Sequence, residues 1–178
     1  DFHLFSDDNI NPSLDTWHHI AFTKSGTEVR LYLNGVLIAI DLTNETVTTD
    51  ATLRIGTIGF DRLYQSFDGY LDDVMFFNHA LSEAEVKDII PEPITLALFD
   101  GVNDYIRVED DDSLDFGQDQ DFSISLWFRA ENIPSDSDLH GGAQLLSKRG
   151  GSDETGYVVY YENRTVNETY GKIVLRLD

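Results

Sequence analysis

The sequence predicts an all-β protein, an antiparallel jelly-roll sandwich with one short helix. Three observations support this fold class: short alternating runs of apolar and polar residues recur, Gly, Asn and Asp turns separate them, and a helix-start signal occurs once. With 178 residues, of which 41% are hydrophobic and 12% aromatic, the chain can form one domain with a substantial core.

The strands can be assigned in order along the chain. Residues 28–33 alternate as E-V-R-L-Y-L, and Asn34-Gly35 separates them from the apolar run at 36–40. An Asn-Gly pair between two such runs predicts a β-hairpin, because a type I′ turn needs positive φ at both central positions. Further strands are expected at residues 51–55, 70–77, 122–128, 156–161 and 172–177.

One helix is predicted near the middle of the chain. Ser82 and Glu85 have the spacing of a capping box, in which the two side chains satisfy free amides of the first turn reciprocally. The helix is expected to run to residue 89 or 90 and to end before Pro91, which cannot continue it. Residues 91–94 are predicted to be a short proline-containing linker between residues 1–90 and residues 95–178.

Both ends of the chain carry strand-like sequence. The run at 171–178 has the pattern of a strand that is cut short, and the run at 1–5 has the pattern of a strand already under way. Placed end to end, the two runs would make one uninterrupted β segment. We therefore expect either a circularly permuted fold or one period of a tandem array, and we favour the array.

Composition limits the classes of partner. The formal net charge is −21, from 33 acidic and 12 basic residues, which disfavours nucleic acid and anionic membrane surfaces. The chain has no cysteine, so a disulfide-stapled domain is excluded, although an extracellular location is not. No apolar run reaches the length of a membrane span, so membrane insertion is not expected. Three N-x-S/T sequons, at Asn44, Asn163 and Asn167, are candidate glycosylation sites.

Several motifs, spread over nearly the whole chain, are specific when taken together. They include Trp17-His18-His19-Ile20-Ala21 and the runs LYLNG at 31–35, FDGYLDDV at 67–74 and LALFDGVNDYI at 96–106. These motifs resemble LamG-like jelly-roll domains of the concanavalin A-like lectin/glucanase superfamily. In this resemblance the two halves stand in rotated order: residues 1–90 are similar to the C-terminal half of the family's domain, and residues 95–178 to its N-terminal half.

The resemblance implies a calcium site. In the family fold the segments that carry two acidic turns lie on neighbouring strands, and hard carboxylate oxygens suit Ca²⁺. The first candidate set is Asp100, Asp104, Asp72, Asp73 and Asn103, with Asp68 as a further ligand. A second candidate set, similar to a pentraxin-type arrangement, is Asp153, Glu154 and Asp61. Solvated turn aspartates are the alternative interpretation of both sets.

Enzymatic activity is not expected. The glucanases of this superfamily carry paired carboxylates in an E-x-D-x-x-E spacing, which this sequence lacks. His18 and His19 are adjacent on a predicted strand and point to opposite faces, so they cannot share one metal. Aromatic residues that either bind sugar or belong to the core are Tyr157, Tyr160, Tyr161, Tyr64 and Trp17.

The sequence thus predicts a non-enzymatic extracellular or cell-surface structural module. We expect it to be one period of a tandem-repeat surface or filament protein, whose copies associate head-to-tail by strand complementation. The alternative function is that of a calcium-dependent carbohydrate-binding or adhesion lectin domain, with glycans as partners. An endoglycosidase is the third hypothesis.

Overall fold

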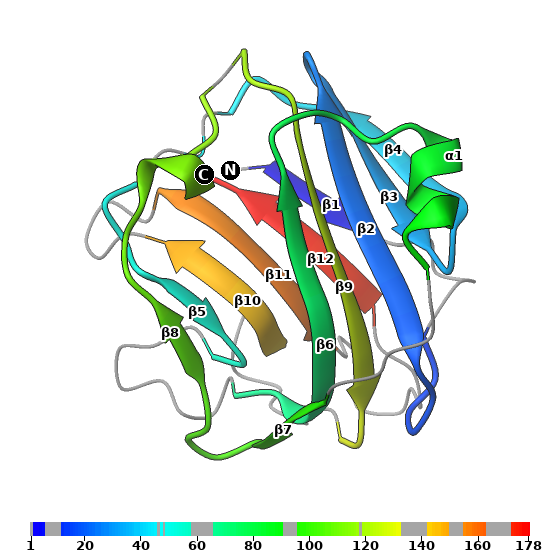
Figure 1. Ribbon diagram of the computed structural model, residues 1–178, viewed down its shortest axis with the longest axis vertical. Coiled ribbons are helices and arrows are strands. Elements are labelled where there is room, and N and C mark those ends of the chain that lie inside the picture. Colours follow the sequence, from blue (N-terminus) through cyan, green and yellow to red (C-terminus); the bar gives the residue numbers. More distant parts are fainter. Residues whose placement is uncertain are drawn as a thin grey trace.

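The computed structural model describes residues 2–5, 12–45, 47, 49–57, 66–90, 96–117, 119–132, 142–149, 155–162 and 172–178. In these residues the chain forms two six-stranded sheets that face each other, with one short α-helix (Figure 1). All pairings between named strands are antiparallel. The predicted all-β jelly-roll sandwich is therefore confirmed.

The first sheet has the order β1-β12-β11-β10-β5-β8. Its strands are β1 (Phe2–Phe5), β12 (Lys172–Leu177), β11 (Gly156–Glu162), β10 (Ala143–Arg149), β5 (Leu53–Ile55) and β8 (Ile106–Val108). The three strands β10, β11 and β12 are buried along most of their length, whereas all three residues of the edge strand β8 are exposed.

The second sheet has the order β4-β3-β2-β9-β6-β7. Asn34 and Gly35 adopt φ values of 50° and 75° between β3 and β4, which confirms the predicted hairpin turn. Its strands are β4 (Val36–Leu42), β3 (Glu28–Leu33), β2 (His18–Ser25), β9 (Phe122–Ala130), β6 (Asp68–Phe77) and β7 (Ala97–Asp100).

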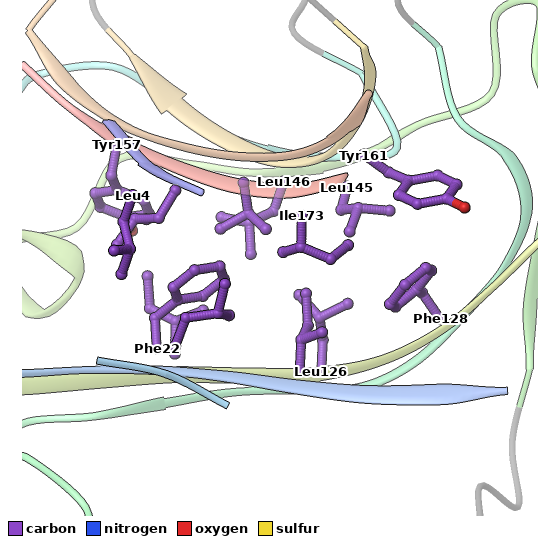
Figure 2. Close-up of a cluster of buried hydrophobic side chains, with 14 of the residues drawn as sticks. Leu4, Phe22, Leu126, Phe128, Leu145, Leu146, Tyr157, Tyr161 and Ile173 are labelled. Carbon is purple, nitrogen blue, oxygen red and sulfur yellow. The ribbon is translucent and has the colours of Figure 1, made fainter. Parts of the chain in front are cut away.

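The core lies between the two sheets. Phe22 and Leu126 of the second sheet face Leu145 and Ile173 of the first, and none of the four is more than 1% exposed (Figure 2). Fully burying a side chain of this size contributes roughly 1.5–3 kcal/mol relative to leaving it exposed, so this layer is the main source of stability.

The helix α1 (Glu83–Asp88) packs on the outer face of the second sheet. The Ser82 hydroxyl accepts a hydrogen bond from the Glu85 amide at 3.3 Å, and the Glu85 carboxylate accepts one from the Ser82 amide at 2.8 Å. The predicted capping box is therefore confirmed. Val86 is fully buried in a cluster with Ala21 and Tyr32, which fixes the helix on the sheet. Residues 91–94, the predicted linker, lie outside the described residues.

The two ends of the chain are neighbouring antiparallel strands. β1 pairs with β12 from Phe2 opposite Leu177 to Phe5 opposite Val174, and the termini lie side by side in Figure 1. The prediction that the terminal runs would form one uninterrupted strand is therefore wrong. A single strand would continue in one direction, whereas β12 has β11 on one side and the reversed β1 on the other.

Candidate functional site

The first predicted calcium set begins at the turn that follows β7. Asp100 accepts hydrogen bonds from the amides of Val102 at 2.9 Å and Asn103 at 3.3 Å, and Asp104 accepts one from the Asp100 amide at 3.2 Å. These amide contacts, the one from Val102 above all, lower the pKa of Asp100. Asp68 lies directly opposite Asp100 across the β6–β7 pair. The carboxylates of Asp100 and Asp104 thus stabilise the turn, and Asp68 is the neighbour of Asp100 on the adjacent strand.

Asp72 and Asp73 do not join this turn. They follow Asp68 along β6 by four and five residues, which places Asp72 about 13 Å from the Asp68 position at the rise of a β-strand. Asp72 is opposite Trp127, and its carboxylate accepts a hydrogen bond from the Asp73 amide. The prediction that they converge with Asp100 and Asp104 is therefore wrong. Among the described residues, no group of three or more His, Cys, Asp or Glu side chains is arranged to hold a metal.

Of the other predicted metal and glycosylation residues, only Asn44 is among the described residues. Asn44 is exposed, as a glycosylation site requires. The second calcium set and two of the three sequons lie outside the described residues: Asp61, Asp153, Glu154, Asn163 and Asn167.

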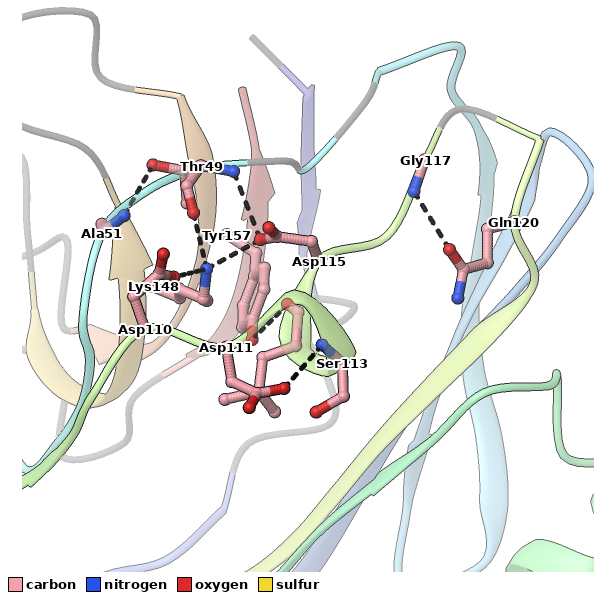
Figure 3. Close-up of polar contacts among 11 residues, drawn as sticks. Thr49, Ala51, Asp110, Asp111, Ser113, Asp115, Gly117, Gln120, Lys148 and Tyr157 are labelled. Carbon is pink, nitrogen blue, oxygen red and sulfur yellow. Dashed lines mark hydrogen bonds and ion pairs between the residues drawn. The ribbon is translucent and has the colours of Figure 1, made fainter.

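A buried lysine forms a polar site that connects three segments of the described chain. Lys148 is on β10, and its side chain is 0% exposed. Its ammonium donates to the carbonyl oxygen of Thr49 at 2.6 Å, to Asp110 Oδ1 at 2.8 Å and to Asp115 Oδ1 at 2.7 Å (Figure 3). All three donors of the ammonium are thereby satisfied. We call these four residues the Lys148 cluster.

The loop before β9 brings the two carboxylates of the Lys148 cluster together. It contains a 3₁₀-helix (Asp112–Leu114) that is N-capped by Asp111, whose side chain accepts from the Ser113 amide. Asp110 and Asp115 are separated by four residues, and their spacing does not indicate that they share a cation. The available signal was a lysine two positions after Leu146 on the same strand, which alternation places on the face that carries this apolar side chain.

A group of aromatic side chains lies on the outer face of the second sheet. Trp17 has its ring centroid 6.2 Å from that of Tyr70 and 6.5 Å from that of Trp127, and His19 is 5.4 Å from Trp127. The Arg129 guanidinium lies over the Tyr70 ring at 5.4 Å. We call these five residues the aromatic cluster.

The aromatic cluster contains buried polar atoms without a hydrogen-bond partner. They are Trp127 Nε1, His19 Nδ1 and Arg129 Nε. Burial lowers the pKa of His19 to about 4, so the ring is neutral, and its Nε2 is 2.7 Å from the Ser125 hydroxyl. A buried polar atom without a partner costs free energy, so the packing of this cluster is less fully compensated than that of the Lys148 cluster.

The predicted sugar-contacting residues divide between the core and the surface. Tyr157 and Tyr161 are core residues whose hydroxyls donate to the carbonyls of Leu114 and Pro12, and Tyr160 is buried with Val158 and Val174. Trp17 belongs to the partly exposed aromatic cluster. Tyr64 lies outside the described residues.

The two adjacent histidines point to opposite faces of β2, as predicted. His18 contacts the core residue Phe128, whereas His19 contacts Trp127 on the outer face. Sequence reasoning missed Tyr70, Trp127 and Arg129, although the alternation in β6 and β9 places them on one face.

Two packed antiparallel sheets with one helix against an outer face define a jelly-roll sandwich. Residues 4–87 match the family model described as the concanavalin A-like lectin/glucanases superfamily. This match covers slightly less than half of the chain and supports a LamG-like jelly-roll domain. Neither the curated proteins nor the solved structures yielded a significant match to the chain.

At the level of the family, the match supports a non-enzymatic lectin-like or adhesion module. LamG-like domains are typically extracellular. In the described part of the chain, no helix has the length and apolar character needed to cross a membrane.

Proposed function

We propose that this domain is a non-enzymatic extracellular structural module, one period of a tandem-repeat surface or filament protein whose copies exchange halves. The observation that carries the proposal is the interleaving of the strands. β9 lies between β2 and β6, and β5 lies between β10 and β8, so each part of the chain completes a sheet of the other.

Neither part of the chain can bury its apolar faces alone. Phe122, Ile124 and Leu126 of β9 are at most 1% exposed, and β2 and β6, both from residues 1–90, flank this strand. The contact between the halves is therefore equivalent to a domain core cut in two, which is the most apolar class of protein interface.

Exchange between copies would preserve these contacts. If residues 96–178 of one copy pack on residues 2–90 of the next, the same strand neighbours meet, and only the connection between the halves must change its path. Domain swapping of this kind costs little, because it exchanges identical elements. An exchange that runs in one direction does not close on itself and propagates as a filament.

The pairing of β5 with β8 offers a direct test, because each strand comes from a different half. Arg54 and Arg107 are Cα partners in this pair, and neither is buried. The chain has no native cysteine. We expect that Arg54→Cys chains and Arg107→Cys chains, refolded together and oxidised, form a mixed disulfide dimer on a denaturing gel.

The matched control uses two positions within one half. Arg30 and Ile40 are partners in the β3–β4 hairpin, so separate Arg30→Cys and Ile40→Cys chains should not form a specific dimer. A single chain that carries both Arg54→Cys and Arg107→Cys provides a further comparison. Exchange of halves is wrong if this double variant forms only an intrachain disulfide and the mixture of single variants yields no more dimer than the control.

Carbohydrate binding is a second candidate function, favoured by the aromatic cluster. Trp17 and Tyr70 are partly exposed aromatic rings, and Arg129 with Asp15 and Glu131 adds a donor and acceptors beside them. Neutral sugars present C–H faces to aromatic rings and hydroxyls to such polar groups, and the net charge of −21 disfavours acidic ligands. Calcium, as a structural cofactor of such a lectin, is proposed at the turn after β7, where the side chains of Asp100, Asp104 and Asp68 would have to move together to bind it, since they are not arranged as a metal site in the structure.

The carbohydrate proposal is tested with a panel of neutral oligosaccharides and isothermal titration calorimetry. We expect Trp17→Ala and Tyr70→Ala to weaken binding at least tenfold, since each removes a stacking face. Tyr105, which is 53% exposed and lies outside the aromatic cluster, provides the matched control Tyr105→Ala. If all three variants bind the sugar with the same affinity, or if the wild type does not bind at all, the aromatic cluster is excluded as a sugar site.

A further inference from the structure

We propose that Lys148 and Asp115 form an intramolecular isopeptide bond, and that Asp110 carries the protons of this reaction. The proposal concerns the Lys148 cluster and goes beyond the assembly function, since both bonded residues lie within residues 95–178. It assigns a covalent modification site to a chain that has no cysteine for a disulfide.

The reacting groups are held in contact, and the lysine side chain is shielded from water. Lys148 Nζ is 2.7 Å from Asp115 Oδ1 and 2.8 Å from Asp110 Oδ1, and the lysine side chain is 0% exposed. An amine at this distance from a carboxyl oxygen is close to attacking distance from the carboxyl carbon. Groups positioned in this way have effective molarities high enough to favour condensation within one molecule.

The environments of the two carboxylates assign their roles. Asp115 is 20% exposed, and its Oδ1 also accepts the Thr49 amide at 3.3 Å, so a backbone donor is available to the oxygen that gains charge when nitrogen attacks. Asp110 is 36% exposed and contacts the same ammonium. Both carboxylates contact the lysine in Figure 3, and we assign Asp115 as the electrophile and the more exposed Asp110 as the group that accepts a proton and releases it towards solvent.

The reaction is a balanced condensation. Asp110 takes one proton from the Lys148 ammonium, which frees the nitrogen lone pair to attack Asp115 Cγ. The C–N bond forms as the C–O bond breaks, and Asp110 transfers protons from nitrogen to the departing oxygen. One ammonium and one carboxylate thus become one amide and one water, without any oxidant or cofactor.

Proton transfer to a carboxylate is the step that activates the lysine. Burial alone lowers the pKa of Lys148, but the hydrogen bonds to Asp110 and Asp115 outweigh this effect and raise the pKa overall. The cluster therefore rests as an ion pair, and the neutral amine arises within the pair. We expect a slow, autocatalytic reaction that proceeds only in the folded chain.

The bond would join two elements that no strand pairing connects. Asp115 follows the 3₁₀-helix at one end of the sandwich, and Lys148 is on β10. A covalent bond here would hold the loop before β9 on the first sheet and would survive local unfolding. Such a bond suits a module that carries load between neighbours in an array.

The experiment is intact-mass spectrometry of the full chain after incubation in the folded state at neutral pH. The expected mass is lower than the sequence mass by one water molecule, and a protease digest should contain a branched peptide that joins Lys148 to Asp115. Wild-type protein that keeps its full sequence mass, while circular dichroism shows it folded, would overturn the proposal. A branched peptide at Asp110 instead would overturn the assignment of roles.

Matched variants separate the covalent bond from the ion pair. Lys148→Arg keeps a cation with hydrogen-bond donors but cannot form an isopeptide bond, so it should retain full mass. Asp110→Asn should also retain full mass, because the proton carrier is lost. Asp115→Asn should lose ammonia instead of water if Asp115 is the electrophile. Since the wild-type mass is decisive by itself, the proposal is tested even if a variant fails to fold.

Discussion

The Lys148 cluster and the aromatic cluster are two buried polar sites that differ in how their polar atoms are satisfied. Every donor of the Lys148 ammonium has a partner within 2.8 Å, whereas Trp127 Nε1 and His19 Nδ1 have none. A fully paired cluster stabilises one structure, whereas each buried atom without a partner carries a desolvation cost that no hydrogen bond offsets. The comparison therefore separates a site whose hydrogen bonds are complete from a site whose hydrogen bonds are incomplete, and the second is the one that we propose as a binding surface.

The largest effect is expected when the paired cluster is broken in chains that have not formed the covalent bond. Lys148→Met removes the cation between Asp110 and Asp115 and leaves two carboxylates facing each other. Removing one partner of a buried ion pair typically costs 3–5 kcal/mol, and the partial exposure of both aspartates reduces this to about 3 kcal/mol. Urea unfolding at pH 7 measures the change.

The control for this prediction is an exposed ion pair. Lys87 and Glu83 form such a pair on α1, with both side chains more than half exposed, so Lys87→Met should leave the free energy of unfolding almost unchanged. Equal effects of the two substitutions would mean that the Lys148 cluster does not stabilise the fold.

Local features were predictable from the sequence, and the two clusters mostly were not. The Asn34-Gly35 turn and the Ser82–Glu85 capping box depend on residues within a few positions of each other, and both are confirmed. The Lys148 cluster joins positions 49, 110, 115 and 148, and only the tertiary fold brings these together.

The family resemblance placed strands beside one another but did not set their register. The mistaken inclusion of Asp72 and Asp73 in the calcium set shows the consequence, because a shift of four residues along β6 moves a side chain by about 13 Å. Similarly, Trp17 was recognised as an aromatic candidate, but its neighbours Tyr70 and Trp127 require the order β2-β9-β6, which alternation alone does not provide.

The second prediction uses pH to examine the unpaired cluster. The pKa of His19 falls from 6.5 to about 4 on folding, so protonation favours the unfolded chain. The contribution of neutral His19 to stability is complete above pH 6.5 and is lost as the pH falls towards 4. The full loss is about 3 kcal/mol at 1.36 kcal/mol per pKa unit.

Unfolding free energies of the wild type and His19→Gln, measured between pH 4 and 7, check this prediction. We expect a shallower slope for His19→Gln, because the side chain no longer takes up a proton on unfolding. The exposed His79 is the control, and His79→Gln should retain the wild-type profile. If the His19 variant and the wild type have the same slope, the ring is not held neutral by burial.

The third prediction concerns the one hydrogen bond that His19 makes through its side chain. Ser125→Ala removes the hydroxyl that is 2.7 Å from His19 Nε2 and leaves both ring nitrogens unpaired. We expect a loss of about 1–2 kcal/mol in urea unfolding, the cost of a buried polar group without a partner. A change close to zero would mean that water already reaches the ring, and the aromatic cluster would then be more open than its burial indicates.

The smallest effect is expected from calcium at the turn after β7, where carboxylates are already engaged by amides. Asp100 Oδ1 accepts two amide hydrogen bonds and Asp104 Oδ2 accepts one, so only their other oxygens and Asp68 remain as ligands. With so few free ligands we expect weak binding, and at ten times Kd the stabilisation is about 1.4 kcal/mol. Thermal melting in millimolar Ca²⁺ and in EDTA measures this difference, which Asp100→Asn should abolish and Asp72→Asn, a carboxylate away from the turn, should preserve. Identical melting temperatures of the wild type in Ca²⁺ and in EDTA would show that these aspartates serve only to form the turn.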